Sequence, residues 1–228
     1  MYTFSILPFV QMSCTRSSLL LRNHLLNISS PLSNEFCILR HGQSMANVQH
    51  LISSHPDVAP FKHGLSPIGR QQAEAAGQAV LQYYKNGNYD GLTILSSDYL
   101  RANETATIVG VATGVPVTVE TALRERWFGE WDGGSDVHYP DVWNDDALDP
   151  YHTNRGVESV MAVMDRTTTC VLQWNQRLTN HLILLVAHGD VLQITQTAFS
   201  KMDGSQHRTL DHLDTATLRP LRLVMDQL

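Results

Sequence analysis

An arginine, a histidine and a glycine stand directly after the apolar run Phe36–Leu39, as Arg40, His41 and Gly42. The apolar run predicts a buried strand, and ligands of open α/β sheets bind where the strands end. The guanidinium of Arg40 offers a planar fork of donors that suits phosphate oxygens. Gly42 lacks a side chain, which lets a phosphate approach the imidazole and the nearby backbone NH groups. The stretch therefore indicates a phosphate site around a histidine.

A second histidine–glycine pair follows the most apolar run of the chain, Leu182–Ala187, which we expect to be a central strand. His188 and Gly189 then stand at the carboxyl end of that strand. Asp190 comes next, and its carboxylate could cap the following helix or lie beside the site as an auxiliary carboxylate; capping is favoured, since Asp is a common N-cap residue. If the two histidines share one phosphate, they must lie within about 8 Å of each other.

A second arginine, Arg101, falls in the first turn of a predicted helix that follows the strand-like run Gly91–Leu95. Asp98 can cap this helix, which should reach about Val111. If the strands are parallel neighbours, Arg101 lies near the first histidine. An ordinary surface arginine is the alternative.

The other elements follow from local signals. Ser66 and Pro67 mark the start of a helix that should run to about Tyr84. The runs 115–119 and 216–221 are typical of strands, and a long amphipathic helix opens near Gly156. The loop 122–134 is dense in charged, aromatic and glycine residues, as functional loops often are. Six aspartates without a Lys or Arg lie between 132 and 149, which predicts an acidic, partly helical surface segment.

Length and composition limit the classes of function. The 228 residues suit one α/β domain. The net charge of -6 and the lack of a Lys/Arg-rich tract argue against nucleic acid or an anionic membrane as the main partner. No apolar run approaches the roughly 20 residues that span a bilayer. The three cysteines and eleven histidines lack disulfide or metal-ligand spacing, so we expect no metal. The sequence carries no signal for an oligomeric state.

Residues 1–34 form a distinct leader, which contains Arg16 and Arg22 but no Asp or Glu and is rich in Ser and Leu. Such a start resembles an organellar transit peptide. A disordered extension and an upstream start codon, with Met12 as the true start, are the alternatives. We therefore expect a domain over residues 35–228, in the cytoplasm or, if the leader targets, in a mitochondrion or plastid.

Five motifs in order resemble those of the histidine phosphatase superfamily, in the branch of the cofactor-dependent phosphoglycerate mutases and their phosphatase relatives. They span about residues 35 to 221 and read Arg40-His41-Gly42 with Ser44 and Asn47, Leu65-Ser66-x-x-Gly69-x-x-Gln72-Ala73, Ser97-x-x-Arg101-Ala102-x-x-Thr105-Ala106, Leu123-x-Glu125-x-x-x-Gly129, and Ala187-His188-Gly189. One match would be weak, but five in order are specific. The resemblance implies a three-layer α/β/α sandwich with a mostly parallel central sheet.

The resemblance also implies roles for the matched residues. His41 would be the nucleophile that accepts the phosphoryl group, and Arg40, Arg101 and His188 would grip its oxygens without a metal or cofactor. Glu125 would protonate the leaving oxygen and then activate water. The substrate-binding residues expected from the same motifs are Asn47, Gly42, Ser44 and Gly189. Without the ordered set of family motifs, each residue has an ordinary structural interpretation. Asn47 would cap a helix or lie on the surface, Glu125 would form a solvated ion pair with Arg124 or Arg126, and His188 would be a hydrogen-bonded core histidine.

Hydrolysis of small phosphomonoesters is the expected activity. A phosphoglycerate mutase is the first alternative, but the segment after the Glu125 loop lacks the longer basic insertions of the mutases. Lys62, Arg124 and Arg126 could still contact a second anionic group. A catalytically silent relative that binds phosphorylated ligands or proteins is the second alternative, and the presence of both histidines, both arginines and the glutamate disfavours it.

Overall fold

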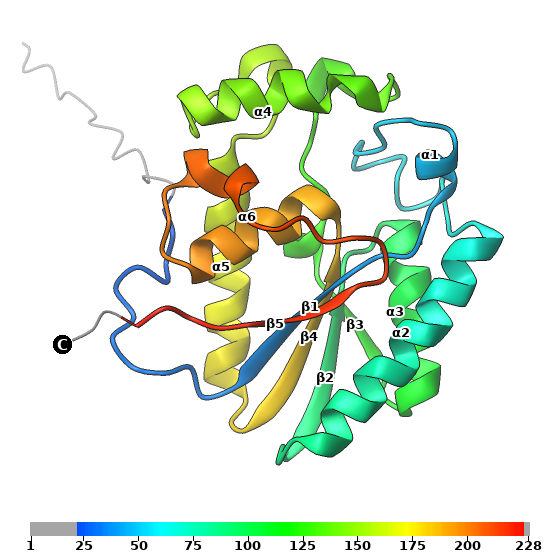
Figure 1. Cartoon of the computed structure of the whole chain (residues 1–228), viewed down its shortest axis with the longest axis vertical. Coiled ribbons are helices and arrows are strands. Elements are labelled where there is room, and N and C mark those ends of the chain that lie inside the picture. The colour runs from blue at the N-terminus through cyan, green and yellow to red at the C-terminus, as the bar shows by residue number, and fades with distance from the viewer. Residues whose placement is uncertain (1–21, 226–228) are drawn as a thin grey trace, which may run out of the picture.

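The computed structural model describes residues 22–225 and is built around a five-stranded sheet (Figure 1). The strands are β1 (Glu35–Arg40), β2 (Gly91–Ser96), β3 (Val117–Val119), β4 (His181–Ala187) and β5 (Leu218–Leu221). Their order is β3-β2-β4-β1-β5, and only β5 runs antiparallel to its neighbour. The predicted central position of the most apolar run is confirmed, because β4 has two strands on each side.

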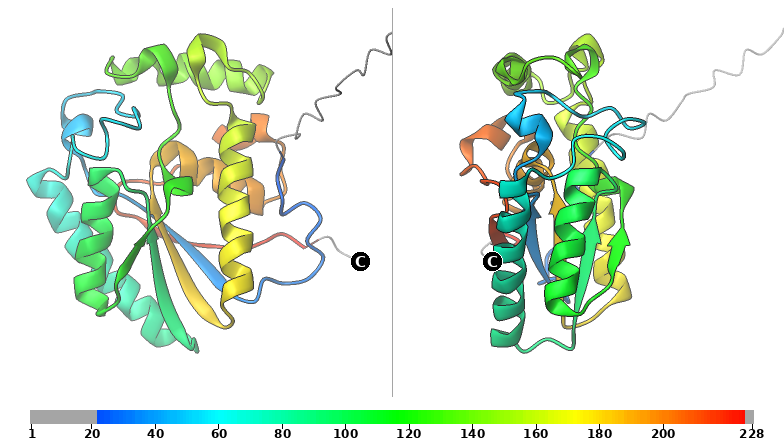
Figure 2. Two further views of the ribbon diagram at one scale, coloured as in Figure 1. Left: turned by 180° about the vertical axis from the view of Figure 1, so that it is seen from behind. Right: turned by 90° about the vertical axis from the view of Figure 1, so that its right-hand side faces the viewer.

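Helices cover both faces of the sheet. The pair α2 (Pro67–Asn86) and α3 (Leu100–Thr113) packs on one face, and α5 (Val160–Arg177) with α6 (Gly189–Phe199) packs on the other. Seen from behind, α3 and α5 run on opposite sides of the strands (Figure 2). The expected three-layer α/β/α sandwich is confirmed.

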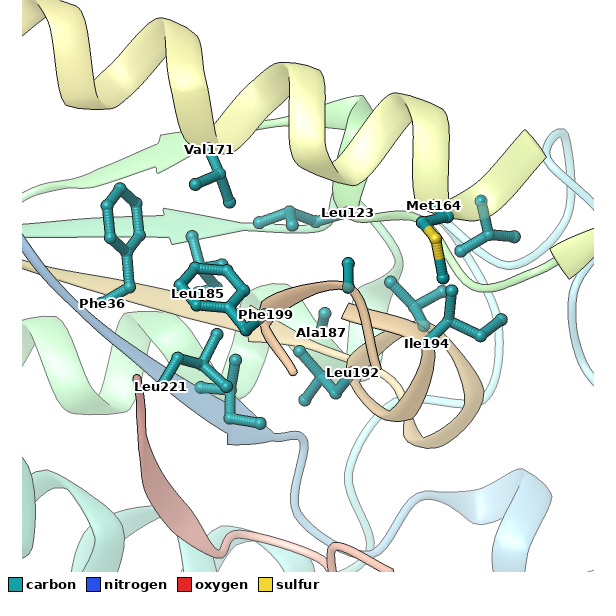
Figure 3. Close-up of a cluster of buried hydrophobic side chains, with 14 of the residues drawn as sticks. Phe36, Leu123, Met164, Val171, Leu185, Ala187, Leu192, Ile194, Phe199 and Leu221 are labelled. Carbon is teal, nitrogen blue, oxygen red and sulfur yellow. The ribbon is translucent and has the colours of Figure 1, made fainter. Parts of the chain in front are cut away.

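Alternation along the strands explains the two layers. In β4, Ile183 and Leu185 belong to the cluster on the α5/α6 side, whereas Leu182 and Leu184 belong to the cluster on the α2/α3 side. Figure 3 shows Leu185 within the first of these clusters. Side chains of successive strand residues project to opposite faces, so a strand that is buried on both faces must be apolar throughout. This is why Leu182–Ala187 shows no polar position.

Two predicted helix starts have different outcomes. Ser66 caps α2 as predicted, since its Oγ accepts from the NH of Gly69 and Pro67 is the first helical residue. The predicted cap by Asp98 on α3 is wrong. Tyr99 holds the N-cap position without a side-chain bond, and the Asp98 carboxylate instead accepts from Nε and Nη2 of Arg124 at 2.8 and 2.5 Å.

Two further helices, α1 (Met45–Val48) and α4 (Tyr139–Leu148), lie beyond the end of the sheet toward which β1, β2 and β4 point (Figure 1). Residues 22–225 also contain 3₁₀ turns at Thr121–Leu123, Gly129–Trp131, Asp136–His138, Asn154–Gly156 and Gly204–Thr209. The predicted helical character of the acidic segment is confirmed by α4. Its surface character holds only in part, because Asp146 is completely buried.

The described part of the N-terminal segment packs on the α/β layers. Leu25 is completely buried in the α5/α6 cluster, and the Nδ2 of Asn23 donates to the carbonyl of Ala198 at 2.9 Å. Residues 1–21 lie outside the described residues, so the targeting role of the leader stays a prediction. No helix within residues 22–225 is long and apolar enough to cross a membrane.

Candidate active site

His41 leaves the end of β1 with its imidazole held in one tautomer. Its backbone NH donates to the carbonyl of Ala187 at the end of β4, at 3.0 Å. Its Nδ1 lies 2.7 Å from the carbonyl of Gly42. Because a carbonyl oxygen can only accept, Nδ1 carries the proton and the lone pair stands on Nε2. The ring is therefore prepared to act as a base or nucleophile through Nε2.

Two arginines flank this ring. Nε of Arg101, in the first turn of α3, donates to Nε2 of His41 at 3.1 Å, and its Nη2 donates to the carbonyl of Ser53 at 2.9 Å. Nη1 of Arg40 donates to the carbonyl of Leu213 at 2.9 Å. Among the described residues, Nη1 of Arg101 and Nε of Arg40 have no protein partner. Buried donors without a protein acceptor suit an anion.

Electrostatics keep His41 neutral. The pKa of His41 lies well below its ordinary value, first because the ring is buried and then because Arg101 and Arg40 repel a positive charge on it. The bond to the Gly42 carbonyl acts in the opposite direction but is weaker. At neutral pH the imidazole is therefore unprotonated on Nε2.

The second histidine lies beside the first. Arg40 pairs with Ala187 in the β1/β4 register, so His41 and His188 leave the sheet side by side. Their ring centroids are 5.2 Å apart, inside the limit of about 8 Å set by a shared phosphate. His188 is completely buried, with Nε2 at 2.9 Å from Oγ of Ser97 and Nδ1 unpartnered among the described residues.

Glu125 reaches the same place from the loop after β3. Its carboxyl group is nearly buried, and Oε1 accepts from the NH of Arg126 at 3.0 Å. Burial, with the nearby Asp190 carboxylate, raises the pKa of Glu125 to about 7, although Arg101 opposes the shift. Both protonation states are therefore accessible near neutral pH, as proton transfer requires.

Glu125 forms no ion pair with its neighbours in the chain. Arg124 pairs with Asp98, and Arg126 pairs with Asp146. A solvated pair of Glu125 with Arg124 or Arg126 is therefore not what the structure contains.

The segment after His41 wraps the other side of the site. Ser44 and Asn47 form a capping box at the start of α1, since Oδ1 of Asn47 accepts from the NH of Ser44 and Oγ of Ser44 accepts from the NH of Asn47. Both side chains also line the cavity described below. Capping and cavity lining are therefore combined in Asn47.

Close packing explains why glycine stands at two positions of the site. A Cβ on Gly42 would lie 2.4 Å from the carbonyl oxygen of Gly69, so the space is taken by α2 rather than by the cavity. A Cβ on Gly189, the first residue of α6, would lie 3.3 Å from Cζ of Arg40. Gly189 therefore lets the Arg40 guanidinium lie against the start of α6.

These side chains surround a cavity of about 220 Å³ at the carboxyl edge of the sheet. Of the predicted site residues, it is lined by Arg40, His41, Ser44, Asn47, Arg101, Glu125 and Gly189. Gly42 and His188 do not line it, although the His188 ring lies 5.2 Å from that of His41. The cavity is also lined by Asp136, Tyr139, Trp143, Asp190, Arg208 and His212. Lys62, Arg124 and Arg126, predicted as contacts for a second anion, do not line this cavity.

These further cavity residues carry no sequence signal. Nε2 of His212 lies 2.8 Å from Nη1 of Arg40 because the chain returns over the site before β5 pairs with β1. The guanidinium of Arg208 stacks on Trp143, with Cζ 3.7 Å from the ring centroid. Arg208 and Trp143 are 65 residues apart in the chain, so only the fold brings them together.

The predicted cap by Asp190 is wrong. His188 holds the N-cap position of α6, and the Asp190 carboxylate instead accepts from Nη1 of Arg126 at 3.2 Å and from Nε1 of Trp143 at 3.0 Å. Burial alone would raise the pKa of Asp190, but Arg126, with His207 and Arg208, keeps that pKa below its usual range. Asp190 is a buried carboxylate beside the cavity, which was the alternative.

No group of three or more His, Cys, Asp or Glu side chains within residues 22–225 is arranged to hold a metal ion.

The chain is similar in sequence and in fold to known phosphatases and mutases. A glucosyl-3-phosphoglycerate phosphatase of Mycolicibacterium vanbaalenii is 32% identical over 169 residues, which cover 68% of this chain and 69% of the relative. A 2,3-bisphosphoglycerate-dependent phosphoglycerate mutase of Cytophaga hutchinsonii is 26% identical over 80% of this chain and 84% of its own length. The structure of a mycobacterial glucosyl-3-phosphoglycerate phosphatase complexed with VO3 superposes with a TM-score of 0.69 at 27% identity, over 82% of this chain and 90% of that one.

The family follows from the sequence profile as well as from these relatives. The profile of the histidine phosphatase superfamily (branch 1) matches residues 36–227, which include all five motifs and, apart from Glu35 at the start of β1, every strand of the sheet. The chain therefore belongs to branch 1 of the histidine phosphatase superfamily and is a phosphatase.

Proposed function

We propose that the chain hydrolyses small phosphomonoesters through a phosphohistidine formed on Nε2 of His41. The observation that carries the proposal is the bond from Nδ1 of His41 to the Gly42 carbonyl, which leaves the Nε2 lone pair beside a cavity with two arginines and a buried glutamic acid. The five motifs and the phosphatase relatives support the same chemistry.

The first step transfers the phosphoryl group to the enzyme. Nε2 of His41 attacks phosphorus while the bond to the leaving oxygen breaks, and the protonated Glu125 gives its proton to that oxygen. Arg101 shifts its donor from Nε2 to a phosphate oxygen, and the free donors of Arg40 and Arg101 take the developing negative charge. The proton on Nδ1 of His41 stays on its bond to the Gly42 carbonyl throughout.

The second step returns the enzyme to its initial state. Glu125, now a carboxylate, takes a proton from water, and the resulting hydroxide attacks phosphorus as the bond to Nε2 breaks. The products are inorganic phosphate and neutral His41. A glutamate with a pKa of about 7 suits both roles, because it gives and takes a proton at similar cost near neutral pH.

A substrate with a single phosphate fits the charges best. Arg40 and Arg101 gather at His41, whereas the third arginine that lines the cavity, Arg208, lies 3.6 Å from the carboxylate of Asp190. A second phosphate there would meet Asp136 and Asp190 with one partly neutralised arginine. Glucosyl-3-phosphoglycerate, named in the relatives, carries one phosphate and is therefore the first compound to test.

Mutase activity is disfavoured on the same ground, since a bisphosphorylated intermediate needs a second cationic subsite. The arginines proposed for it face elsewhere: Arg124 binds Asp98 and Arg126 is enclosed by Asp146 and Asp190.

The test compares the parent with His41→Ala in the presence of EDTA, using p-nitrophenyl phosphate and glucosyl-3-phosphoglycerate as substrates. We expect phosphate release to fall about a thousandfold or more, with loss of an acid-labile phosphoryl label on the protein. His24→Ala is the matched control, because His24 does not line the cavity and its imidazole instead contacts Asp165 on α5. A parallel assay uses 3-phosphoglycerate as the substrate. Transfer of its phosphate between positions without release would favour the mutase, and silence of the parent in both assays would favour the binding protein.

A further inference from the structure

Arg126, the residue after the proposed general acid, carries the largest of the completely buried side chains. Its backbone NH is the donor that holds Oε1 of Glu125 at 3.0 Å. A backbone donor orients a carboxyl group only as well as the backbone itself is held. The orientation of Glu125 therefore depends on what fixes Arg126.

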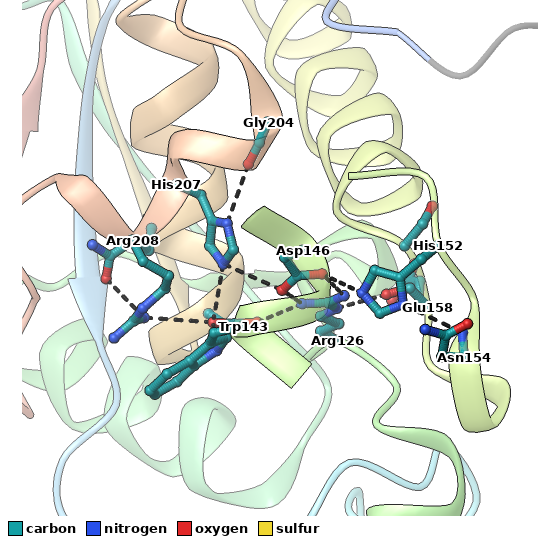
Figure 4. A network of polar contacts seen from close by, with 12 residues as sticks. Arg126, Trp143, Asp146, His152, Asn154, Glu158, Gly204, His207 and Arg208 are labelled. Atoms are coloured by element: carbon teal, nitrogen blue, oxygen red, sulfur yellow. Dashed lines mark hydrogen bonds and ion pairs between the residues drawn. The ribbon is translucent and has the colours of Figure 1, made fainter. Parts of the chain in front are cut away.

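Three parts of the chain hold the Arg126 guanidinium in place (Figure 4). Nη1 and Nη2 donate to the two carboxylate oxygens of Asp146, on α4, at 2.6 and 2.7 Å. Nε donates to the carbonyl of Glu158, just before α5, at 2.6 Å. Nη1 also reaches Oδ2 of Asp190, on α6, at 3.2 Å. Each guanidinium nitrogen thus has a partner, and the fork of Asp146 sets the plane of the group.

Asp146 is itself held from further directions. Its Oδ1 lies 2.7 Å from Nε2 of His152, and its Oδ2 lies 3.6 Å from Nε2 of His207. Asp146, His207 and Arg126 are all completely buried. Figure 4 shows that their side chains point toward one another. A carboxylate with this many contacts cannot turn without breaking several of them.

Stability alone does not account for such a pair. Well-packed apolar side chains often stabilise a core as much as or more than a buried ion pair, because both charges lose their hydration. What an ion pair adds is direction, since a bidentate contact fixes the geometry. Here the fixed geometry of the ion pair also fixes the Arg126 peptide group, whose NH binds Glu125.

We propose that Arg126 and Asp146 form a positioning pair that aims the carboxyl group of Glu125 at the leaving oxygen of the substrate. The pair acts through the Arg126 peptide and does not touch the substrate, because neither side chain lines the cavity. This inference rests on the proposed function of Glu125 as the proton donor.

The test is Asp146→Asn, measured as kcat/KM for glycerol 3-phosphate and for p-nitrophenyl phosphate. An alkoxide leaving group needs a proton from Glu125, whereas p-nitrophenolate leaves almost without one. A misaimed acid should lower kcat/KM for glycerol 3-phosphate by about 10- to 100-fold and leave p-nitrophenyl phosphate within about threefold. Asp145→Asn, the neighbouring aspartate on α4, which binds Asn154, is the matched control and should change neither.

Arg126→Lys is the second variant, because it keeps the buried cation if Asp146→Asn fails to fold. Lysine cannot form the two-point contact with Asp146, so the same selective loss is expected. Equal losses with both substrates in folded variants, or no loss, would overturn the positioning role. Failure of the parent to hydrolyse p-nitrophenyl phosphate would instead count against the proposed function itself.

Discussion

Raising the pH through neutrality should remove the proton that Glu125 gives to the leaving oxygen. Burial raises the pKa of Glu125 to about 7. The fraction of protonated Glu125 then falls from about nine tenths at pH 6 to about one tenth at pH 8. His41 is already neutral over this interval, because its pKa lies well below the ordinary value of 6.5. For an alkyl phosphate, kcat/KM should therefore fall about tenfold between these two pH values.

The assay compares two leaving groups and two variants. The parent should show the alkaline fall in kcat/KM with glycerol 3-phosphate and a much smaller one with p-nitrophenyl phosphate. Glu125→Gln should lose the alkaline fall and about 10²- to 10⁴-fold of kcat/KM with the alkyl ester. Glu130→Gln, an exposed glutamate on the same loop, should behave as the parent.

Two results would refute this reasoning. One is a flat profile for the alkyl ester between pH 6 and 8. The other is an alkaline fall of the same size in Glu125→Gln, because that variant has no proton to lose at this position.

Two further predictions concern stability. Glu125 keeps its proton up to pH about 7 in the folded protein but ionises near pH 4.5 in the unfolded chain. The free energy of unfolding of the parent therefore falls as the pH rises from about 4.5 to about 7. Glu125→Gln should gain, relative to the parent, about 3 kcal/mol across this interval in urea unfolding, and an unchanged difference would show that the carboxyl group is not desolvated. Gly42→Ala places a Cβ 2.4 Å from the rigid carbonyl of Gly69 and should lower stability by about 1 to 3 kcal/mol in thermal unfolding; an unaltered Tm would contradict the close approach of the two backbones.

Much of the site could be predicted from the sequence because the carboxyl ends of parallel strands lie at one edge of the sheet. The apolar runs before His41 and His188 are short, continuous and free of polar positions, as strands buried on both faces must be. Their carboxyl ends therefore meet, and the register that pairs Arg40 with Ala187 places the rings 5.2 Å apart. Family motifs extended the same reasoning to Glu125, whose loop has no periodicity of its own.

Capping residues were the weaker part of the prediction. Asp98 and Asp190 both precede or begin a helix and have the residue type of a cap. In the folded protein each has an arginine within reach, Arg124 and Arg126, and the charged bond prevails over a neutral contact with the helix end. Ser66 has no such competitor and caps as predicted.

The sequence by itself determined the succession of strands and main helices along the chain, the two histidines at the sheet edge and the neutral state expected of a nucleophile between arginines. Only the tertiary structure decided the further residues that line the cavity and the buried pair of Arg126 and Asp146. Arg126 and Asp146 are 20 residues apart, and Arg208 meets Trp143 across 65 residues. Such contacts leave no pattern along the chain, because their spacing depends on how loops cross the sheet edge rather than on a helix or strand period. A buried arginine looks like a surface arginine until the fold encloses it.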